Sequence, residues 1–220
     1  MEAVRKGAIH KGKSWPDGIV EEMQEHGVPE WYIESCRKIQ YLFPKAHAVA
    51  YVMMAFRIAW FKVHKPLAFY SAYFYRRSQK DSFDADMMLG GAEKVRNKIK
   101  EIQQNPAATA KEEDLLTTLE AVYEFYMRGF SFAGIDLYKS DATRFVIDGD
   151  ALRPPFVAIS GLGETAALDL MHCRESGKSF LSVEELSAAC PKVSQTHLET
   201  LRAMGALGDL PETSQMSLFG

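Results

Sequence analysis

The sequence has few cysteines, no long apolar run and no secretion signal, and each absence narrows the class of protein. Three cysteines among 220 residues are too few and too scattered for a disulfide framework or a zinc site. No stretch of about 18 uninterrupted apolar residues occurs, so we expect no transmembrane helix. Residues 1–15 lack the apolar core of a signal peptide. These features predict a cytoplasmic protein without a membrane partner.

Carboxylate pairs that could hold a metal are also scarce. Asp84-Ala85-Asp86 lies where a helix is expected to begin, so we interpret it as a helix cap and a first-turn charge. Asp148-Gly149-Asp150 lies between segments rich in Val, Ile and Phe, which predicts the turn of a β-hairpin. We therefore assign no metal ligand and no catalytic residue in this sequence.

The charge changes sign along the chain. Residues 1–100 carry 17 Lys and Arg against 11 Asp and Glu. Residues 101–150 carry 4 against 10, and residues 151–220 carry 5 against 8. A basic first part followed by an acidic remainder indicates a polyanionic partner that is contacted from one side.

The hydrophobic pattern predicts a mainly α protein with a helical first part, one small β-hairpin and a flexible C-terminal tail. Helices are expected over residues 18–40 (in two pieces), 48–64, 67–77, 84–104, 111–129, 182–189 and 194–204. The segment 48–64 is apolar on most of its faces, so we expect it in the centre of a packed unit.

Residues 159–174 read ISGLGETAALDLMHCR, with two glycines directly before an alanine-rich helix. A dinucleotide fingerprint would need a preceding buried strand, for which Pro154-Pro155 leave little room. The pattern instead resembles a helix-hairpin-helix motif, in which backbone amides at a helix N-terminus bind a phosphate. The predicted DNA-binding residues are Gly161, Leu162, Gly163, Glu164 and Thr165. An ordinary structural turn is the alternative.

A second, degenerate copy of the motif follows. Ser182 and Glu185 have the spacing of a capping box at the start of one helix. Residues 191–193 form a short connection, and a last helix spans residues 194–204. We therefore predict a tandem pair of helix-hairpin-helix units that binds duplex DNA.

The end of the chain resembles the pentapeptide with which bacterial proteins bind the sliding clamp. Two adjacent apolar side chains could enter a hydrophobic pocket while a glutamine amide satisfies polar groups at its edge. The predicted clamp-binding residues are Gln215, Met216, Ser217, Leu218 and Phe219. A chain end without function is the alternative.

Several motifs recur in a familiar order over essentially all 220 residues. They are WYIESCRKIQYLFPKAHAVAYVMMAFRIAWFKVHKPLAFYSAYF, MRGFSFAGIDLYKSDATRFVIDG, PPFVAISGLGETAA and LPETSQMSLF. This order resembles the C-terminal end of the PolC-type DNA polymerase III alpha subunit, a replicative polymerase of low-GC Gram-positive bacteria. The resemblance implies part of the fingers domain over residues 1–104, a connecting helix and hairpin over 105–150, tandem duplex-binding units over 151–208 and a clamp-binding tail over 209–220.

The resemblance also implies what this chain lacks. The catalytic aspartates of the family's palm domain, which hold Mg²⁺ ions for nucleotidyl transfer, lie upstream of the matching region. The chain alone is then inactive, and the remainder of the polymerase is its partner. Within the implied fingers, Lys45, His47 and Arg57 would lie on the nucleotide or template side. A solvated Lys45, a locally packed His47 and an Arg57 paired with a buried carboxylate are the structural alternatives.

A second hypothesis is a stand-alone helix-hairpin-helix accessory protein that binds DNA and the clamp. The two hypotheses differ in what they predict for the helices between residues 29 and 74. Exposed apolar surface there would indicate a unit that lacks its packing partner.

Overall fold

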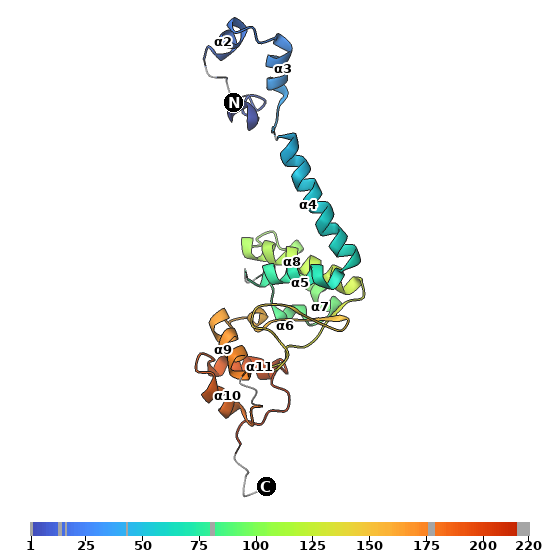
Figure 1. Ribbon diagram of the computed structural model, residues 1–220, viewed down its shortest axis with the longest axis vertical. Helices are drawn as coiled ribbons and strands as arrows, with labels where there is room; N and C mark the ends of the chain where they lie inside the picture. Colours follow the sequence, from blue (N-terminus) through green and yellow to red (C-terminus); the bar gives the residue numbers. More distant parts are fainter. Residues whose placement is uncertain are drawn as a thin grey trace. The chain divides into compact units, whose positions relative to one another are not determined.

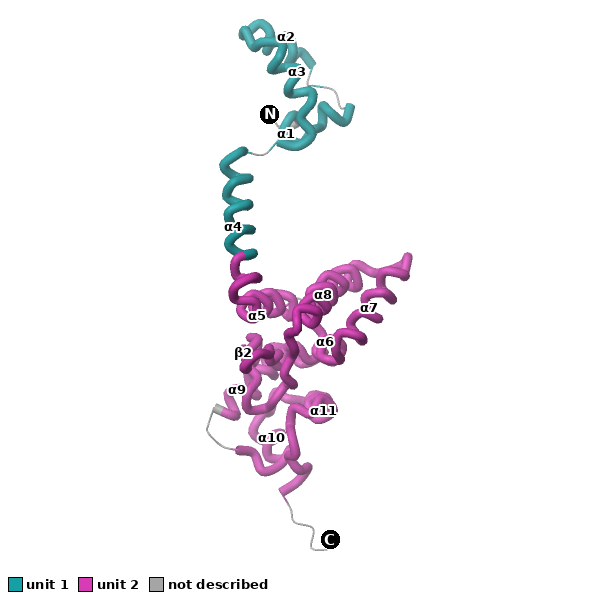
Figure 2. Tube along the Cα trace, turned by 90° about the vertical axis from the view of Figure 1, so that its right-hand side faces the viewer, with its two compact units in different colours: residues 1–59 teal, residues 60–220 magenta. Residues whose placement is uncertain are grey.

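The computed structural model describes residues 2–12, 15, 17–42, 44–79, 82–175 and 179–214. It divides into two compact units, Met1–Ala59 and Trp60–Gly220 (Figure 2). The boundaries predicted at residues 104, 150 and 208 all fall within the second unit, and they stay predictions.

The described chain is mainly α with one small sheet, as predicted (Figure 1). Its helices are α1 Glu2–Arg5, α2 Ile19–Glu25, α3 Glu30–Lys38, α4 Lys45–His64, α5 Pro66–Ser78, α6 Ala85–Met88, α7 Ala92–Gln104, α8 Ala110–Met127, α9 Glu164–Glu175, α10 Val183–Ala189 and α11 Gln195–Ala203. The strands are β1 Ser131–Phe132, β2 Val146–Asp148 and β3 Ala151–Arg153, and Phe156–Ala158 form the 3₁₀ turn η1.

The first unit has a small core on α3, where Ile33 and Cys36 are buried. Gly7 packs so closely against the backbone of Gln40 that a Cβ would lie 2.0 Å from the Gln40 carbonyl oxygen. Gly7 also has a φ of 68°, which a residue with a side chain rarely adopts. Only glycine therefore fits at this contact between the two chain segments.

Helix α4 differs from the sequence expectation for residues 48–64. Its large apolar side chains are exposed, and it has no buried residue. The prediction that this helix lies in the centre of a packed unit is wrong for the described chain. None of its residues is buried, although Lys62 near its end pairs with Glu124 on α8. Within the described residues, α4 is also the one helix long and apolar enough to cross a membrane. The absence of a membrane partner stays a prediction.

The second unit has an aromatic core between α5, α8 and the sheet. Tyr70 and Phe74, one turn apart on α5, are fully buried. The ring of Phe74 lies 5.7 Å from that of Phe125 on α8 and 5.6 Å from that of Phe132 on β1. Edge-to-face and tilted contacts of this kind stabilise a core beyond the area that they bury.

The sheet has the order β1-β3-β2. Strands β2 and β3 are antiparallel with Asp148 opposite Ala151, and Gly149 has a φ of 61°. The predicted Asp-Gly hairpin turn is thus confirmed. Strand β1 pairs in parallel with β3 and was not predicted, because two residues are too short for an alternating pattern. Arg153 pairs with Asp148 across the hairpin and holds the pKa of that carboxyl below its ordinary value.

The segment predicted as one helix over residues 84–104 forms two. Gly90 and Gly91 separate α6 from α7, and Gly91 has a φ of 91°. The cap predicted at Asp84 is confirmed, because its carboxylate accepts the N–H groups of Asp86 at 3.0 Å and Met87 at 3.4 Å.

Candidate nucleic-acid interface

Two helical hairpins form the end of the described chain. In the first, η1 leads through the loop at residues 159–163 into α9. In the second, α10 leads through residues 190–194 into α11. Their shared core includes Ile159, Leu162, Ala167, Leu170, Leu186, Leu198 and Leu201, each at most 3% exposed. These apolar side chains hold the two hairpins together.

The first loop is shaped by a tight turn at Gly161. Its φ of 82° lies in the left-handed region, so a side chain there would strain the backbone even though the space is open. The N–H of Leu162 donates to the carbonyl of Ile159 at 3.1 Å. Because its side chain is also buried, Leu162 anchors the loop, and its amide is already used within the turn.

The amides that follow are free. The N–H groups of Gly163, Glu164 and Thr165 have no acceptor within the described residues, and all three residues are exposed. They precede the first helical hydrogen bonds of α9, in which the Gly163 carbonyl accepts from Ala166 at 3.1 Å and from Ala167 at 3.0 Å. Three donors and the positive end of the helix dipole thus face solvent together, as an anion-binding site requires.

The second glycine of the loop is not required by the fold. The backbone of Gly163 lies outside the left-handed region, and a Cβ built on it would meet nothing within 4 Å. Any L-residue could adopt this conformation without a clash. A glycine here instead leaves room for another molecule to approach the free amides closely.

Each hairpin is held by a helix of the other. His197 on α11 accepts the N–H of Ser194 at its Nδ1 atom over 3.2 Å. Its Nε2 therefore carries the proton and donates to the carbonyl of Gly161 at 3.0 Å. Asp169 on α9 accepts the N–H of Lys192 in the second loop at 2.9 Å. These hydrogen bonds thus fix the spacing between the two loops.

His197 and Asp169 were not identified from the sequence. Their partners lie 36 and 23 residues away, too far for any local pattern to show. The Ser194-x-x-His197 spacing predicts only the helix cap that His197 also forms. Of the capping box predicted at Ser182, only one half forms. The Ser182 hydroxyl accepts the Glu185 N–H at 3.1 Å, but the Glu185 carboxylate accepts the N–H of Leu181 at 2.7 Å and not that of Ser182.

A groove lies between the first loop and the beginning of α8. It has a volume of about 440 Å³, with residues 157–163 on one side and Phe83, Asp84, Lys111 and Leu115 on the other. Gly163, the first residue with a free amide, therefore borders a concave surface that includes one cationic side chain, that of Lys111.

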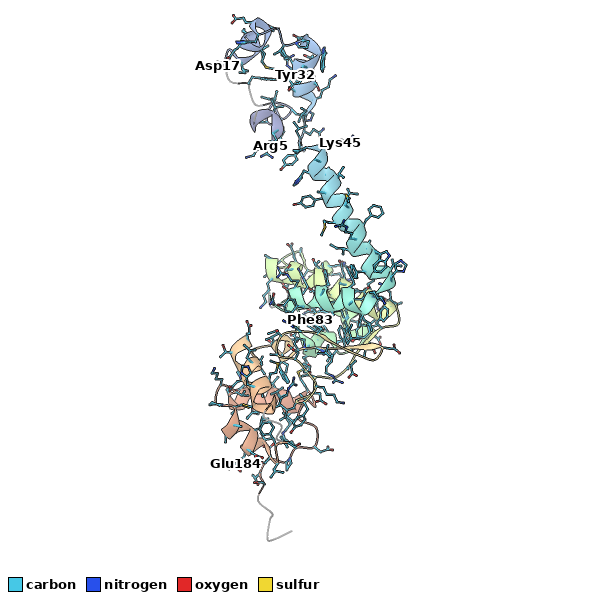
Figure 3. All side chains as sticks on the ribbon, viewed as in Figure 1. Arg5, Asp17, Tyr32, Lys45, Phe83 and Glu184 are labelled. Carbon is cyan, nitrogen blue, oxygen red and sulfur yellow. The ribbon has the colours of Figure 1, made fainter. Side chains whose placement is uncertain are left out.

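Lys45, His47 and Arg57 all lie on α4, but the structure does not bring them together. Lys45 begins the helix (Figure 3) and lines an apolar cavity of about 790 Å³ in the first unit. The ring of His47 packs 4.6 Å from that of Tyr51. Arg57 lies about 18 Å from Lys45 along the helix and has no ion pair within the described residues. Among the described residues no buried carboxylate pairs with Arg57, and a position of the three side chains on the nucleotide or template side stays a prediction.

Mg²⁺ does not fit the two Asp-x-Asp patterns. The Asp84 carboxylate caps α6 and the Asp148 carboxylate pairs with Arg153. Among the described residues, no group of three His, Cys, Asp or Glu side chains is placed to hold a metal ion. The absence of a Mg²⁺ site from the whole chain stays a prediction.

The predicted clamp-binding residues, Gln215 to Phe219, lie outside the described residues. The segment before them packs against α10. Residues 211 and 212 are joined to α10 through hydrogen bonds from the Val183 and Glu184 N–H groups.

Comparison with known proteins identifies a DNA-binding motif in the second unit. Residues 129–216 match the family model of the helix-hairpin-helix motif, which confirms the motif predicted from the glycine loop. The matched residues also include the three-stranded sheet.

The relatives define the particular family. The chain is 51% identical over 220 residues to the PolC-type DNA polymerase III of Bacillus cereus and 50% identical over 223 residues to that of Streptococcus pneumoniae. It is 47% identical over 211 residues to that of Thermotoga maritima. These matches cover 96–100% of this chain and 15% of each relative.

The chain therefore belongs to the PolC-type DNA polymerases III and corresponds to a segment with about 15% of their length. The resemblance seen in the sequence is confirmed. The position of the segment at the C-terminal end of the polymerase stays a prediction.

Proposed function

We propose that this chain holds duplex DNA for a PolC-type DNA-directed DNA polymerase, through the loop at residues 161–165. The observation that carries the proposal is the row of free N–H groups at Gly163, Glu164 and Thr165. Phosphate oxygens accept such hydrogen bonds, and the N-terminus of α9 adds a favourable electrostatic contribution.

This mode of binding suits a replicative enzyme. Backbone amides contact the phosphates and sugars and not the base edges, so they fix the position of DNA without reading its sequence. The Gly161–His197 and Lys192–Asp169 bonds keep the two loops at a constant spacing. A duplex of any sequence that presents its phosphates at that spacing would be held.

Nucleotidyl transfer itself would take place elsewhere in a longer polymerase in the cytoplasm. Such chemistry requires carboxylates that hold metal ions around the reacting groups. In the two Asp-x-Asp patterns, the Asp84 carboxylate caps α6 and the Asp148 carboxylate pairs with Arg153 instead. We expect the isolated chain to bind DNA and to be inactive in DNA synthesis.

The exposed faces of α4 favour this proposal over a stand-alone accessory protein. Its exposed side chains include Phe56 at 74% and Trp60 at 51%. Contiguous apolar surface of this extent indicates a site of protein contact. We propose that the remainder of the polymerase covers α4, since the relatives are several times longer than this chain.

We further propose that residues 215–219 bind the bacterial sliding clamp. A peptide at the end of the chain would hold the polymerase near the clamp, and the resulting high effective concentration would make even a weak contact useful. Calorimetry with purified clamp tests this, with a copy of the chain that ends at Ser214 as the control. Equal binding by both copies would overturn the proposal.

A pair of glycine substitutions tests DNA binding. Gly163→Val places a side chain in front of the free amides, and Gly134→Val is its matched control. Gly134 is exposed, is likewise outside the left-handed region, and has open space at its Cβ position. We expect G163V to weaken binding to a duplex by roughly tenfold to a hundredfold, as the loss of one or two hydrogen bonds to charged phosphate implies.

The control variant should bind as tightly as the unsubstituted chain. Circular dichroism of both variants would show whether the fold is retained. Unchanged duplex affinity of a folded G163V would rule out the loop as the phosphate-binding element.

A further inference from the structure

The groove beside the first loop includes one cation whose position the fold does not explain. Lys111 is the second residue of α8, where a positive charge opposes the helix dipole. The neighbouring Glu112 and Glu113 have the favourable sign, and the Glu112 carboxylate accepts the N–H of Thr109 at 2.8 Å. Lys111 therefore sits at an electrostatically unfavourable position.

No contact within the described residues compensates for this. The Lys111 side chain is exposed and has neither a hydrogen bond nor an ion pair there. The nearby carboxylates already have other partners. That of Asp84 accepts two backbone N–H groups, and that of Asp114 accepts from Arg77 at 2.9 Å. A ligand of opposite charge would give Lys111 the partner that the chain does not supply.

The geometry points Lys111 towards the groove. Leu115, one helical turn further along α8, lines the same groove, and residues four apart lie on the same helix face. The opposite wall is the loop at residues 157–163, which leads into the free amides. An anionic strand held by these amides would thus pass close to the Lys111 ammonium group.

We propose that Lys111 binds a backbone phosphate of the DNA strand that the loop at 161–165 holds. The DNA-binding surface would then extend to α8, which lies outside the matched helix-hairpin-helix residues 129–216. This inference rests on the proposed DNA-binding function and adds a second, electrostatic contact to it.

The test compares Lys111→Ala with the unsubstituted 220-residue chain, using a duplex of mixed sequence as the probe. We expect an approximately fivefold loss of affinity, the effect of one solvent-exposed ionic contact. Over about 50 to 200 mM salt, the slope of log K against log salt should fall by about 1, because one phosphate fewer is neutralised. Lys111→Arg should retain the affinity and the slope.

Lys139→Ala is the matched control, because it removes the same charge from an exposed residue that does not line the groove. Equal salt slopes for K111A and the unsubstituted chain would overturn the inference. If G163V loses binding while K111A does not, the loop still binds DNA and only the role of Lys111 fails. If neither loses binding, the proposed function fails as well.

Inorganic triphosphate as a competitor separates the DNA backbone from a free nucleotide as the source of the phosphate. We expect it to displace the duplex equally poorly from K111A and from the unsubstituted chain. Tight triphosphate binding that is lost in K111A would overturn the assignment to the DNA backbone.

Discussion

Helices α4 and α5 follow each other along the chain, and both are rich in aromatic and aliphatic residues, yet they have opposite environments. Helix α4 has no buried residue, whereas α5 buries Tyr70 and Phe74 completely. The difference lies in what surrounds them. Tyr70 and Phe74 share one face of α5, and α8 and the sheet cover that face. The apolar side chains of α4 are distributed around the helix, and all of them are exposed.

This contrast shows that apolar composition predicts that a helix will be buried but does not identify the element that buries it. In α5 the covering elements, α8 and the sheet, belong to the same chain. In α4 the described residues provide no such burial, and this is the observation behind the proposal that the remainder of the polymerase covers the helix. Four substitutions, one of them followed as a function of pH, test this contrast, beginning with the largest expected effect on stability.

Phe74→Ala should lower the free energy of unfolding by about 3–5 kcal/mol, because it leaves a cavity in the aromatic core. Urea denaturation followed by far-ultraviolet circular dichroism measures this. A loss below about 1 kcal/mol would mean that α5 is not packed as described.

Arg77→Met should cost about 1.5–3 kcal/mol, because Arg77 links α5 to α8. Its guanidinium donates to the Thr118 hydroxyl at 2.7 Å and to the Asp114 carboxylate at 2.9 Å. The neighbouring Arg76 is exposed and has no such contacts within the described residues, so Arg76→Met is the control. Equal effects of the two substitutions in urea denaturation would argue against the α5–α8 link.

The pH dependence of stability should include a contribution from Glu124 on α8. Partial burial raises the pKa of this carboxyl, but hydrogen bonds from Lys62 at 2.8 Å and Tyr70 at 2.9 Å outweigh burial and lower it below 4.5. A lowered folded-state pKa stabilises the fold above the unfolded-state value, and this stability is lost as the pH falls through the folded-state value.

Glu124→Gln should remove this acid-induced loss of stability. The difference in stability between the unsubstituted chain and E124Q should therefore shrink as the solution becomes more acidic. Because the side chain is 42% exposed, we expect an effect below about 1 kcal/mol. Urea titrations between neutral pH and about pH 3 measure it. A difference that is constant with pH would exclude this carboxylate as a contributor.

Phe56→Ala makes the same chemical change as Phe74→Ala at an exposed position of α4. It should change stability by less than about 0.5 kcal/mol, because no packing is lost. It should also reduce self-association, since it removes apolar surface, and sedimentation velocity would detect this. A loss of several kcal/mol would show that α4 is packed within the chain after all.

Much of the local structure could be predicted because its causes are local. Gly161 and Gly163 before an alanine-rich helix predicted the loop, and the Asp148-Gly149 pair predicted the hairpin turn. Asp84 could be predicted as a cap from its own side chain. The break at Gly90-Gly91 was missed, although two adjacent glycines are a signal for the end of a helix.

The candidate site was only partly predictable. The free amides at residues 163–165 follow from the position of a helix N-terminus. The contribution of Leu162 as an anchor follows from its burial, which only the folded core establishes. The groove that brings Lys111 near the loop joins residues about 50 positions apart, and no local pattern connects them.

Local residue patterns account for most of the helices, for the cap at Asp84, for the hairpin turn and for the glycine loop, because backbone conformation there depends on residues within a few positions. Tertiary structure alone establishes that His197 holds Gly161, that Arg77 joins α5 to α8 and that α4 has no buried residue. Those facts depend on which distant segments share a core, and the order of residues does not display these contacts.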